Sequence, residues 1–242
     1  MKTMIYLLTL MSFLVSGCSN TDSALTENDF FETYSDTTAT QKNYKILALG
    51  DSYTIGESVC ETCNFPTQLK DSLEFRFKNK NQVKLKIVAT TGWTTTNLIN
   101  AIDNESLKNT YDLVTLLIGV NNQYQGKPFS IYENEFPQLV NTAIKHANGD
   151  KLNVIVVSIP DYAFTPFGEG NKLISEAIDK YNNFAKQYCS NNNITYLNIT
   201  DITRKGLENP ELVATDRLHP STKAYTKFVE HLLPLVQEKL KD

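Results

Sequence analysis

The sequence predicts an α/β protein, a three-layer α/β/α sandwich built around a central parallel sheet of five strands. Five short apolar runs are spaced along the chain, and each is followed by a segment long enough for a helix. Several of those segments place apolar residues three or four positions apart, which is helical spacing. Strands that alternate with helix-length segments are typical of a parallel sheet with helices on both faces.

The first strand and the first long helix open this pattern. Residues 45–49 form a short apolar run, which predicts a strand. Residues 65–78 are predicted to be a helix, because Pro66 suits its first turn and Leu69 and Leu73 fall on one face.

The next four elements continue the alternation. Residues 83–89 alternate apolar residues with lysines, which predicts a less buried strand near an edge of the sheet. A helix is predicted over 95–104. The run 112–118 is almost continuously apolar, as expected of a central parallel strand. Residues 130–148 are predicted to be helical, with an Asn-Gly pair as the stop signal.

The last elements complete the sheet. Residues 154–159 and 194–199 are predicted strands, and 173–190 and 221–240 are predicted helices. Ligands of parallel sheets bind beyond the carboxyl ends of the strands. We therefore expect any chemistry to lie just after strands one, three and five.

Composition limits the classes of function. The chain has 242 residues, enough for one sizeable core, and its 41% hydrophobic and 21% charged residues are ordinary for a globular protein. Its net charge is −4, and its basic residues are scattered. Binding nucleic-acid phosphates needs clustered Lys and Arg, so nucleic acid is not an expected partner.

The N-terminal segment predicts export. Lys2 is followed by a mostly apolar run over 4–15, which suits a signal peptide and is shorter than the roughly 20 residues that span a bilayer. Residues 14–18, Leu-Val-Ser-Gly-Cys, resemble a bacterial lipobox, which implies cleavage before Cys18 and acylation of its thiol. An ordinary secretory signal is the alternative. We favour the lipoprotein because acyl chains give a physical anchor.

These features divide the chain into three parts. Residues 1–17 are predicted to be a lipoprotein signal peptide. Residues 18–43 are polar with little periodicity and are predicted to be a disordered tether. Residues 44–242 are predicted to form the folded domain. The expected location is a bacterial cell envelope, with the protein lipid-anchored at the outer membrane or facing the periplasm.

Four short motifs fall near the expected strand ends. Each alone has a bland explanation, such as a turn, a helix cap or a loop glycine. Together and in order they are improbable as chance. They are Gly50-Asp51-Ser52, Gly92, Gly119-Val120-Asn121 and Asp216-Arg217-Leu218-His219.

The four motifs resemble the blocks of the SGNH/GDSL hydrolases, a family of serine esterases. Residues 50–56 match the first block, Gly-Asp-Ser-x-Thr-x-Gly, and the other motifs match the later blocks in the same order. The resemblance covers about residues 45–235. It implies the family's flavodoxin-like fold and carboxylic-ester hydrolysis through a serine acyl-enzyme.

The resemblance also implies a role for each matching residue. Ser52 is the expected nucleophile, His219 its base and Asp216 the carboxylate that orients and stabilises the imidazole. The expected oxyanion hole consists of the Ser52 and Gly92 amides and the Asn121 side chain. The Gly-x-Ser-x-Gly elbow of the α/β-hydrolases is absent.

Several nearby residues receive other interpretations. Family members often carry Asp after the third-block Asn, and we interpret Asn122 as a change in loop support. Asp51 is assigned a structural part in the turn, since a carboxylate beside the nucleophile would oppose the developing negative charge. His146 and His231 belong to no motif and are predicted to be surface or helix-end residues.

The remaining cysteines invite separate interpretations. Cys60 and Cys63 lie just after the first block, and a local disulfide is favoured narrowly over free thiols in an exported chain. A thioredoxin-like redox pair is less favoured because the surrounding sequence context does not fit one. A zinc site is less favoured because no second Cys or His pair offers itself. Cys189 falls on the apolar side of its helix and is expected to be buried.

The predicted function is hydrolysis of carboxylic esters, with no metal and no cofactor. The resemblance allows lysophospholipids, acyl thioesters, aryl esters and acetylated sugars as small-molecule, lipid or glycan substrates. An acetylesterase acting on polysaccharide is the nearest alternative enzyme. A catalytically inactive binding lipoprotein of the same fold is the alternative from another class. We expect a monomer.

Overall fold

A computed structural model describes residues 42–78 and 80–240 of the chain. Its single five-stranded sheet has the order β2-β1-β3-β4-β5, and every pair of neighbouring strands is parallel. The predicted parallel α/β fold is confirmed, with β3 at the centre of the sheet. The strands are β1 (Asn43–Gly50), β2 (Gln82–Ala89), β3 (Leu113–Leu117), β4 (Val154–Val157) and β5 (Thr195–Leu197).

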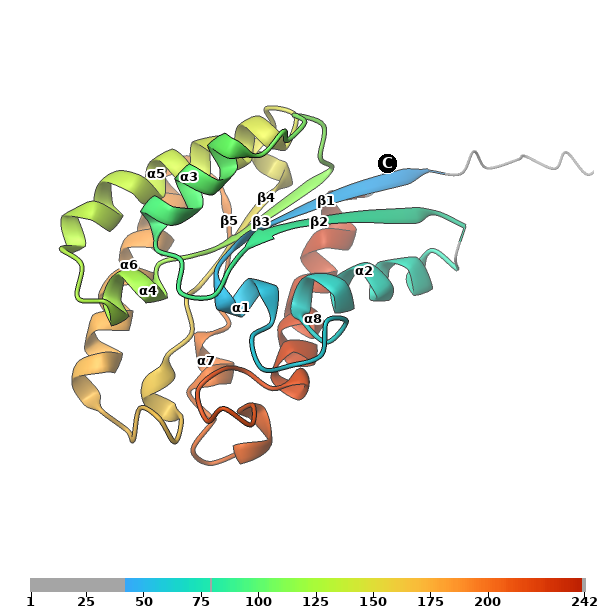
Figure 1. Cartoon of the computed structure of the whole chain (residues 1–242). Coiled ribbons are helices and arrows are strands. Elements are labelled where there is room, and N and C mark those ends of the chain that lie inside the picture. The colour runs from blue at the N-terminus through green and yellow to red at the C-terminus, as the bar shows by residue number, and fades with distance from the viewer. Residues whose placement is uncertain (1–41, 79, 241–242) are drawn as a thin grey trace, which may run out of the picture. The chain divides into compact units, whose positions relative to one another are not determined.

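Long helices cover both faces of the sheet (Figure 1). Helices α2 (Phe65–Arg76) and α8 (Thr222–Lys239) pack together on one face. Helices α3 (Thr95–Asn104), α5 (Phe129–His146) and α6 (Lys172–Asn192) cover the other face. The sheet and these two helix layers make the predicted three-layer sandwich.

The burial of each strand follows its side-chain pattern. All five residues of β3 are buried, and burying a Leu or Val side chain fully stabilises the fold by about 1.5–3 kcal/mol. The edge strand β2 instead exposes residues along its first half, as its alternating lysines predicted. The sheet is therefore anchored at its centre and more open at the β2 edge.

Side-chain caps set the starts of the long helices α2, α3 and α8. Asn64 accepts from the Thr67 amide at the start of α2, and Ser221 accepts from the Ala224 amide at the start of α8. Thr94 and Asn97 form a capping box at the start of α3. The predicted helix bounds agree with these ends to within about two residues.

Several short helices were not predicted. They are α1 (Ser52–Ile55), α4 (Val120–Tyr124), α7 (Thr200–Thr203) and the 3-10 turns Lys151–Asn153, Tyr162–Phe164 and Pro210–Leu212. One turn of helix is too short to show a hydrophobic period. Two of these elements, α1 and α4, begin at carboxyl ends of strands and carry residues of the candidate site.

Gly50 is needed at the end of β1 because neighbouring atoms crowd it. A Cβ at this position would lie 2.5 Å from the carbonyl oxygen of Leu117 and 2.0 Å from the Thr54 hydroxyl oxygen. The close approach of β1, β3 and α1 therefore requires the glycine that precedes Asp51.

Within the described residues, no helix combines the length and the apolar character needed to cross a membrane. The predicted signal peptide and Cys18 lie outside the described residues, as does most of the predicted tether.

Candidate active site

Ser52 lies at the start of α1, directly beyond the carboxyl end of β1. Asp51 precedes it as the helix cap and accepts a hydrogen bond from the Tyr53 amide at 3.0 Å. Ser52 is only 3% exposed. The strand, the cap and the crowded glycine together fix where its hydroxyl points.

The structure brings Ser52, His219 and Asp216 into one hydrogen-bonded chain. The Oγ of Ser52 lies 3.0 Å from Nε2 of His219, although the two residues are 167 positions apart. On the other side of the ring, Nδ1 lies 2.5 Å from Oδ2 of Asp216. An imidazole held this way can accept the serine proton on one nitrogen while the carboxylate orients the other.

Asp216 is surrounded by hydrogen-bond donors. Its Oδ1 accepts from the Leu218 and His219 amides at 2.9 and 3.0 Å, and its Oδ2 accepts from the Ser58 hydroxyl at 2.7 Å. Burial raises the pKa of Asp216, but the His219 ring and these donors more than offset it and lower the pKa to about 2. Asp216 is therefore an anion at any pH near neutrality.

Two further loops face Ser52 from β2 and β3. Gly92 has φ of +83°, a conformation that favours glycine. Asn121, on α4, donates from Nδ2 to the Trp93 carbonyl at 3.1 Å. That bond uses one of its two amide hydrogens and fixes the side chain beside Ser52 and Gly92, with which it lines one cleft.

In the turns and loops of the described chain, the backbone amides of Ser52 and Gly92 have no backbone acceptor. Gln125 donates to the Gly92 carbonyl at 2.9 Å, which holds the glycine loop against α4. The site thus offers free backbone donors next to a neutral side-chain donor, a combination suited to binding an oxyanion.

Asn122, the residue after Asn121 on α4, supports this part of the site from the protein interior. It is fully buried, its Oδ1 accepts from the Thr95 amide at 2.9 Å, and its Nδ2 donates to the Thr95 hydroxyl at 2.7 Å. The residue therefore ties α4 to the start of α3, in agreement with its interpretation as loop support.

Asp51 occupies the opposite electrostatic environment from Asp216. It is fully buried, and its Oδ2 has no hydrogen-bond partner among the described residues. Burial raises its pKa to about 7, against the smaller lowering effects of the Tyr53 amide and the nearby Asn121 amide. Its cap on α1 is the structural part predicted for it.

A cleft of about 170 Å³ opens over Ser52 and His219. No Asp, Glu, Lys or Arg lines this cleft, and His219 is its one basic side chain. The lining residues are Ser52, Tyr53, Thr91, Gly92, Val120, Asn121, Tyr124, Tyr162, Leu218 and His219. The wall is thus mostly apolar, with the polar atoms gathered near the serine.

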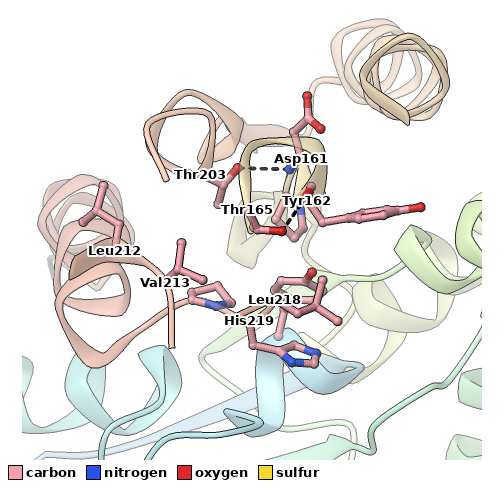
Figure 2. Close-up of a pocket in the computed structure, with 11 residues that line it drawn as sticks. Asp161, Tyr162, Thr165, Thr203, Leu212, Val213, Leu218 and His219 are labelled. Carbon is pink, nitrogen blue, oxygen red and sulfur yellow. Dashed lines mark hydrogen bonds between the residues drawn. The ribbon is translucent and has the colours of Figure 1, made fainter. Parts of the chain in front are cut away.

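A second cavity also borders His219, as Figure 2 shows, but its volume is only about 10 Å³. That is room for about one water molecule, so an ester has to bind in the larger cleft. Two bonds drawn in Figure 2 hold the loop that carries Tyr162: the Asp161 amide donates to the Thr203 hydroxyl oxygen, and the Thr165 hydroxyl donates to the Tyr162 carbonyl.

Three aromatic rings gather at one side of the cleft. Tyr124 lies 5.9 Å from Tyr162 and 6.2 Å from Phe167, measured between ring centroids. Tyr124 and Phe167 are half exposed, whereas Tyr162 is buried. Sequence reasoning missed Tyr124, whose only signal was its position three residues after Asn121.

The structure also places the other singled-out residues. Cys60 and Cys63 form a disulfide, and Cys189 is buried, which raises the pKa of its thiol to about 12. His231 is exposed on α8. His146 ends α5 but is buried, with Nδ1 3.1 Å from the Lys108 carbonyl oxygen. The surface alternative for His146 was therefore wrong, because the loop before β3 covers it.

No cluster of three or more His, Cys, Asp or Glu side chains that could hold a metal ion occurs among the described residues. Sequence reasoning missed Ser58, which reaches Asp216 from a loop 158 positions away. No spacing rule could have paired these two residues.

Comparison with known proteins gives a consistent picture. The model of the GDSL-like lipase/acylhydrolase family matches residues 48–227. A search of the curated proteins gives no match.

Solved structures with the same fold include three hydrolases. A variant of the acetyl xylan esterase Axe2 from Geobacillus stearothermophilus is 17% identical, with a TM-score of 0.64 over 84% of this chain and 98% of that one. A lipase/acylhydrolase from Enterococcus faecalis is 20% identical, with a TM-score of 0.63 over 82% and 97%. A lipase from a goat rumen metagenome is 24% identical, with a TM-score of 0.58 over 79% and 97%.

The raised pKa of Asp51 predicts a pH-dependent stability. Its pKa rises from 3.8 when unfolded to about 7 in the fold, so the contribution of Asp51 to the unfolding free energy is greatest below about pH 4 and is lost as pH rises from about 4 through about 7. Asp51→Asn keeps the cap and removes the titration, so its stability should fall less over this interval. Urea unfolding at several pH values measures this. The exposed Asp103→Asn is the control, and an unchanged pH dependence in Asp51→Asn would contradict the prediction.

Proposed function

The chain is an ester hydrolase of the GDSL-like lipase/acylhydrolase family, and we propose that Ser52, His219 and Asp216 form its catalytic triad. The observation that carries the proposal is the continuous hydrogen-bonded chain from Asp216 through His219 to Ser52, which ends in an open cleft. Ser52 is the nucleophile, His219 the general base and Asp216 the orienting carboxylate.

The reaction has two halves. The Oγ of Ser52 attacks the ester carbonyl carbon while its proton passes to Nε2 of His219. The C–O bond to the alcohol then breaks, and Nε2 gives the proton to the departing alcohol. In the second half His219 takes a proton from water, the resulting hydroxide attacks the acyl group, and Ser52 regains its proton as the carboxylic acid leaves.

Three proposed hydrogen-bond donors stabilise the negative charge that develops on the carbonyl oxygen: the Ser52 amide, the Gly92 amide and the Asn121 side chain. Removing one such donor typically costs about 2.7–4 kcal/mol of transition-state stabilisation. The Trp93 carbonyl and Gln125 preorganise these donors before substrate arrives, because they already hold Asn121 and the Gly92 loop in place.

The cleft supports an ester with an apolar acyl or aryl part, a class that includes lysophospholipids and medium-chain esters. Val120, Tyr124, Tyr162 and Leu218 line the space beside the reacting serine. Each methylene that packs on such a wall gains about 0.8 kcal/mol. A longer acyl chain can cover more of this wall than an acetyl group can.

Replacement of the nucleophile tests the triad. A fluorophosphonate probe should label the wild-type protein and fail to label Ser52→Ala, because the phosphorus traps only an activated serine. Hydrolysis of p-nitrophenyl butyrate should fall by at least about 10⁴-fold in Ser52→Ala. Ser190→Ala, on the exposed side of α6, should behave as wild type. Undiminished labelling of Ser52→Ala, or an unlabelled wild type, would remove the basis of the proposal.

Truncation of the aromatic wall tests the substrate class. Tyr124→Ala should lower kcat/KM for p-nitrophenyl decanoate by about 3- to 10-fold, corresponding to roughly 0.5–1.5 kcal/mol of aromatic contact. The value for p-nitrophenyl acetate should change little. Phe75→Ala removes another exposed aromatic ring, on α2, and serves as the control. Equal losses on the two esters would argue against an acyl-binding role for Tyr124.

We further propose that the enzyme is exported and held at a bacterial cell envelope by lipid on Cys18, on the basis of the lipobox at residues 14–18. In a bacterial host, radiolabelled palmitate should be incorporated into the full chain, and the protein should fractionate with membranes. Cys18→Ser should lose both the label and the membrane association. A wild-type protein that is cleaved but unlabelled and not membrane-bound would support the ordinary secretory signal instead.

A further inference from the structure

We infer that Ser58 is a positioning residue for the triad, and that the Cys60–Cys63 disulfide fixes the loop from which Ser58 reaches Asp216. This inference rests on the proposed function, since it assigns the loop at residues 56–64, here called the disulfide loop, to the support of Asp216. Apart from Gly56, no residue of this loop belongs to the four motifs that resemble the family's blocks.

The first argument is the bond itself. The hydroxyl of Ser58 donates to Oδ2 of Asp216 at 2.7 Å, and Nδ1 of His219 lies 2.5 Å from the same oxygen. With two backbone amides on Oδ1, the carboxylate is held at both ends and cannot rotate away from the imidazole. Ser58 is the one side chain other than His219 that bonds to Asp216 in the described part of the chain.

The second argument is the backbone of Ser58. Its φ is +66°, in the left-handed region that glycine adopts freely and other residues seldom adopt. On backbone grounds alone a glycine would suit this position better. A serine here supplies a hydroxyl that glycine lacks, and the bond to Asp216 is the contact that this hydroxyl makes.

The third argument is how the disulfide loop is fastened. Its end is secured by Asn64, which donates to the Ile55 and Glu61 carbonyls, and by Gln68, which donates to the Cys63 carbonyl at 2.7 Å. The disulfide then joins Cys63 to Cys60, only two residues from Ser58. Because Cys63 is held in place by these hydrogen bonds, the disulfide also restrains Cys60 and the nearby residue Ser58, which contacts Asp216.

The disulfide loop also contacts the segment that precedes Gly92. Glu57, the residue before Ser58, accepts a hydrogen bond from the Thr91 hydroxyl, and Thr91 precedes Gly92 in the cleft wall. Neighbouring residues of one loop thus contact both the carboxylate of the triad and the segment of the proposed oxyanion hole. The Ser58 hydroxyl is also one of the donors that lower the pKa of Asp216, which agrees with a direct electrostatic role.

Replacement of Ser58 by glycine separates positioning from stability. Ser58→Gly removes the hydroxyl and relieves the left-handed backbone, so the melting temperature should stay the same or rise. We expect kcat for p-nitrophenyl butyrate to fall on the order of tenfold, as for loss of a hydrogen bond to a charged group, with KM unchanged. Lys78→Gly relieves a similar φ of +52° far from the site and should leave kcat unchanged.

A double-mutant cycle tests the part played by the disulfide. Cys60→Ala/Cys63→Ala should lower kcat in the wild-type background and should have no further effect in Ser58→Gly, because both changes act on one contact. Should the double cysteine variant fail to fold, dithiothreitol provides a second route. Its two thiols transfer two electrons and two protons to the disulfide, giving two cysteine thiols and cyclic oxidised dithiothreitol, and the fall in kcat should appear only when Ser58 is present.

The outcomes distinguish this inference from the proposed function. If Ser52→Ala is inactive while Ser58→Gly keeps the wild-type kcat, the triad stands and the positioning role of Ser58 is wrong. A kcat loss of the same size from the cysteine changes in both backgrounds would overturn the link between the disulfide and Ser58. If Ser52→Ala stays active, the proposed function fails, whatever Ser58 does.

Discussion

The parallel direction of all five strands is the constraint on which the site depends. Because the strands run the same way in the order β2-β1-β3-β4-β5, their carboxyl ends share one edge of the sheet. Ser52 follows β1, Gly92 follows β2 and Asn121 follows β3, and these strands are direct neighbours. Residues dispersed along some seventy positions of sequence therefore meet without any loop having to travel far. Only the segment of Asp216 and His219, which precedes α8, comes from farther along the chain.

Two carboxylates belong to the surroundings of Ser52, the proposed nucleophile, and the environment of each gives it a different charge. Asp216 accepts from four donors, and its pKa lies at about 2, whereas Asp51 is buried with one unpartnered oxygen, and its pKa lies at about 7. In the proposed mechanism, a negative charge is useful at Asp216, where the imidazolium of His219 would form, and harmful at Asp51, beside the position of the oxyanion. The raised pKa leaves Asp51 substantially protonated near neutrality, which weakens that opposition. The same residue type thus serves as an anion in one place and as a helix cap that is only partly ionised near neutrality in the other.

The fold and the central residues of the candidate site could be predicted because both are marked by short local patterns in the sequence. Apolar runs and helical spacing report strands and long helices, and the ordered motifs identify Ser52, Gly92, Asn121 and His219. The remaining features leave no such trace. A single turn of helix such as α4 has no period, the burial of His146 depends on a loop that covers it, and the contact of Ser58 with Asp216 joins segments 158 positions apart. These contacts are set by tertiary packing, which pattern and propensity do not encode.

Asn122, which stands where family members often carry Asp, fits its surroundings because of the hydrogen bonds made by Thr95 and Glu135. The Thr95 hydroxyl gives its one proton to Glu135, so its oxygen is left as an acceptor, and the amide of Asn122 donates to it. The carbonyl oxygen of the same amide accepts from the Thr95 backbone. An ionised Asp at position 122 could accept that backbone bond but could not donate to the hydroxyl. It would also place a second carboxylate beside the Thr95 hydroxyl, which has only one proton and already donates it to Glu135. Asn122 and Glu135 are therefore a complementary pair, and together they hold the helix that presents Asn121 to the cleft.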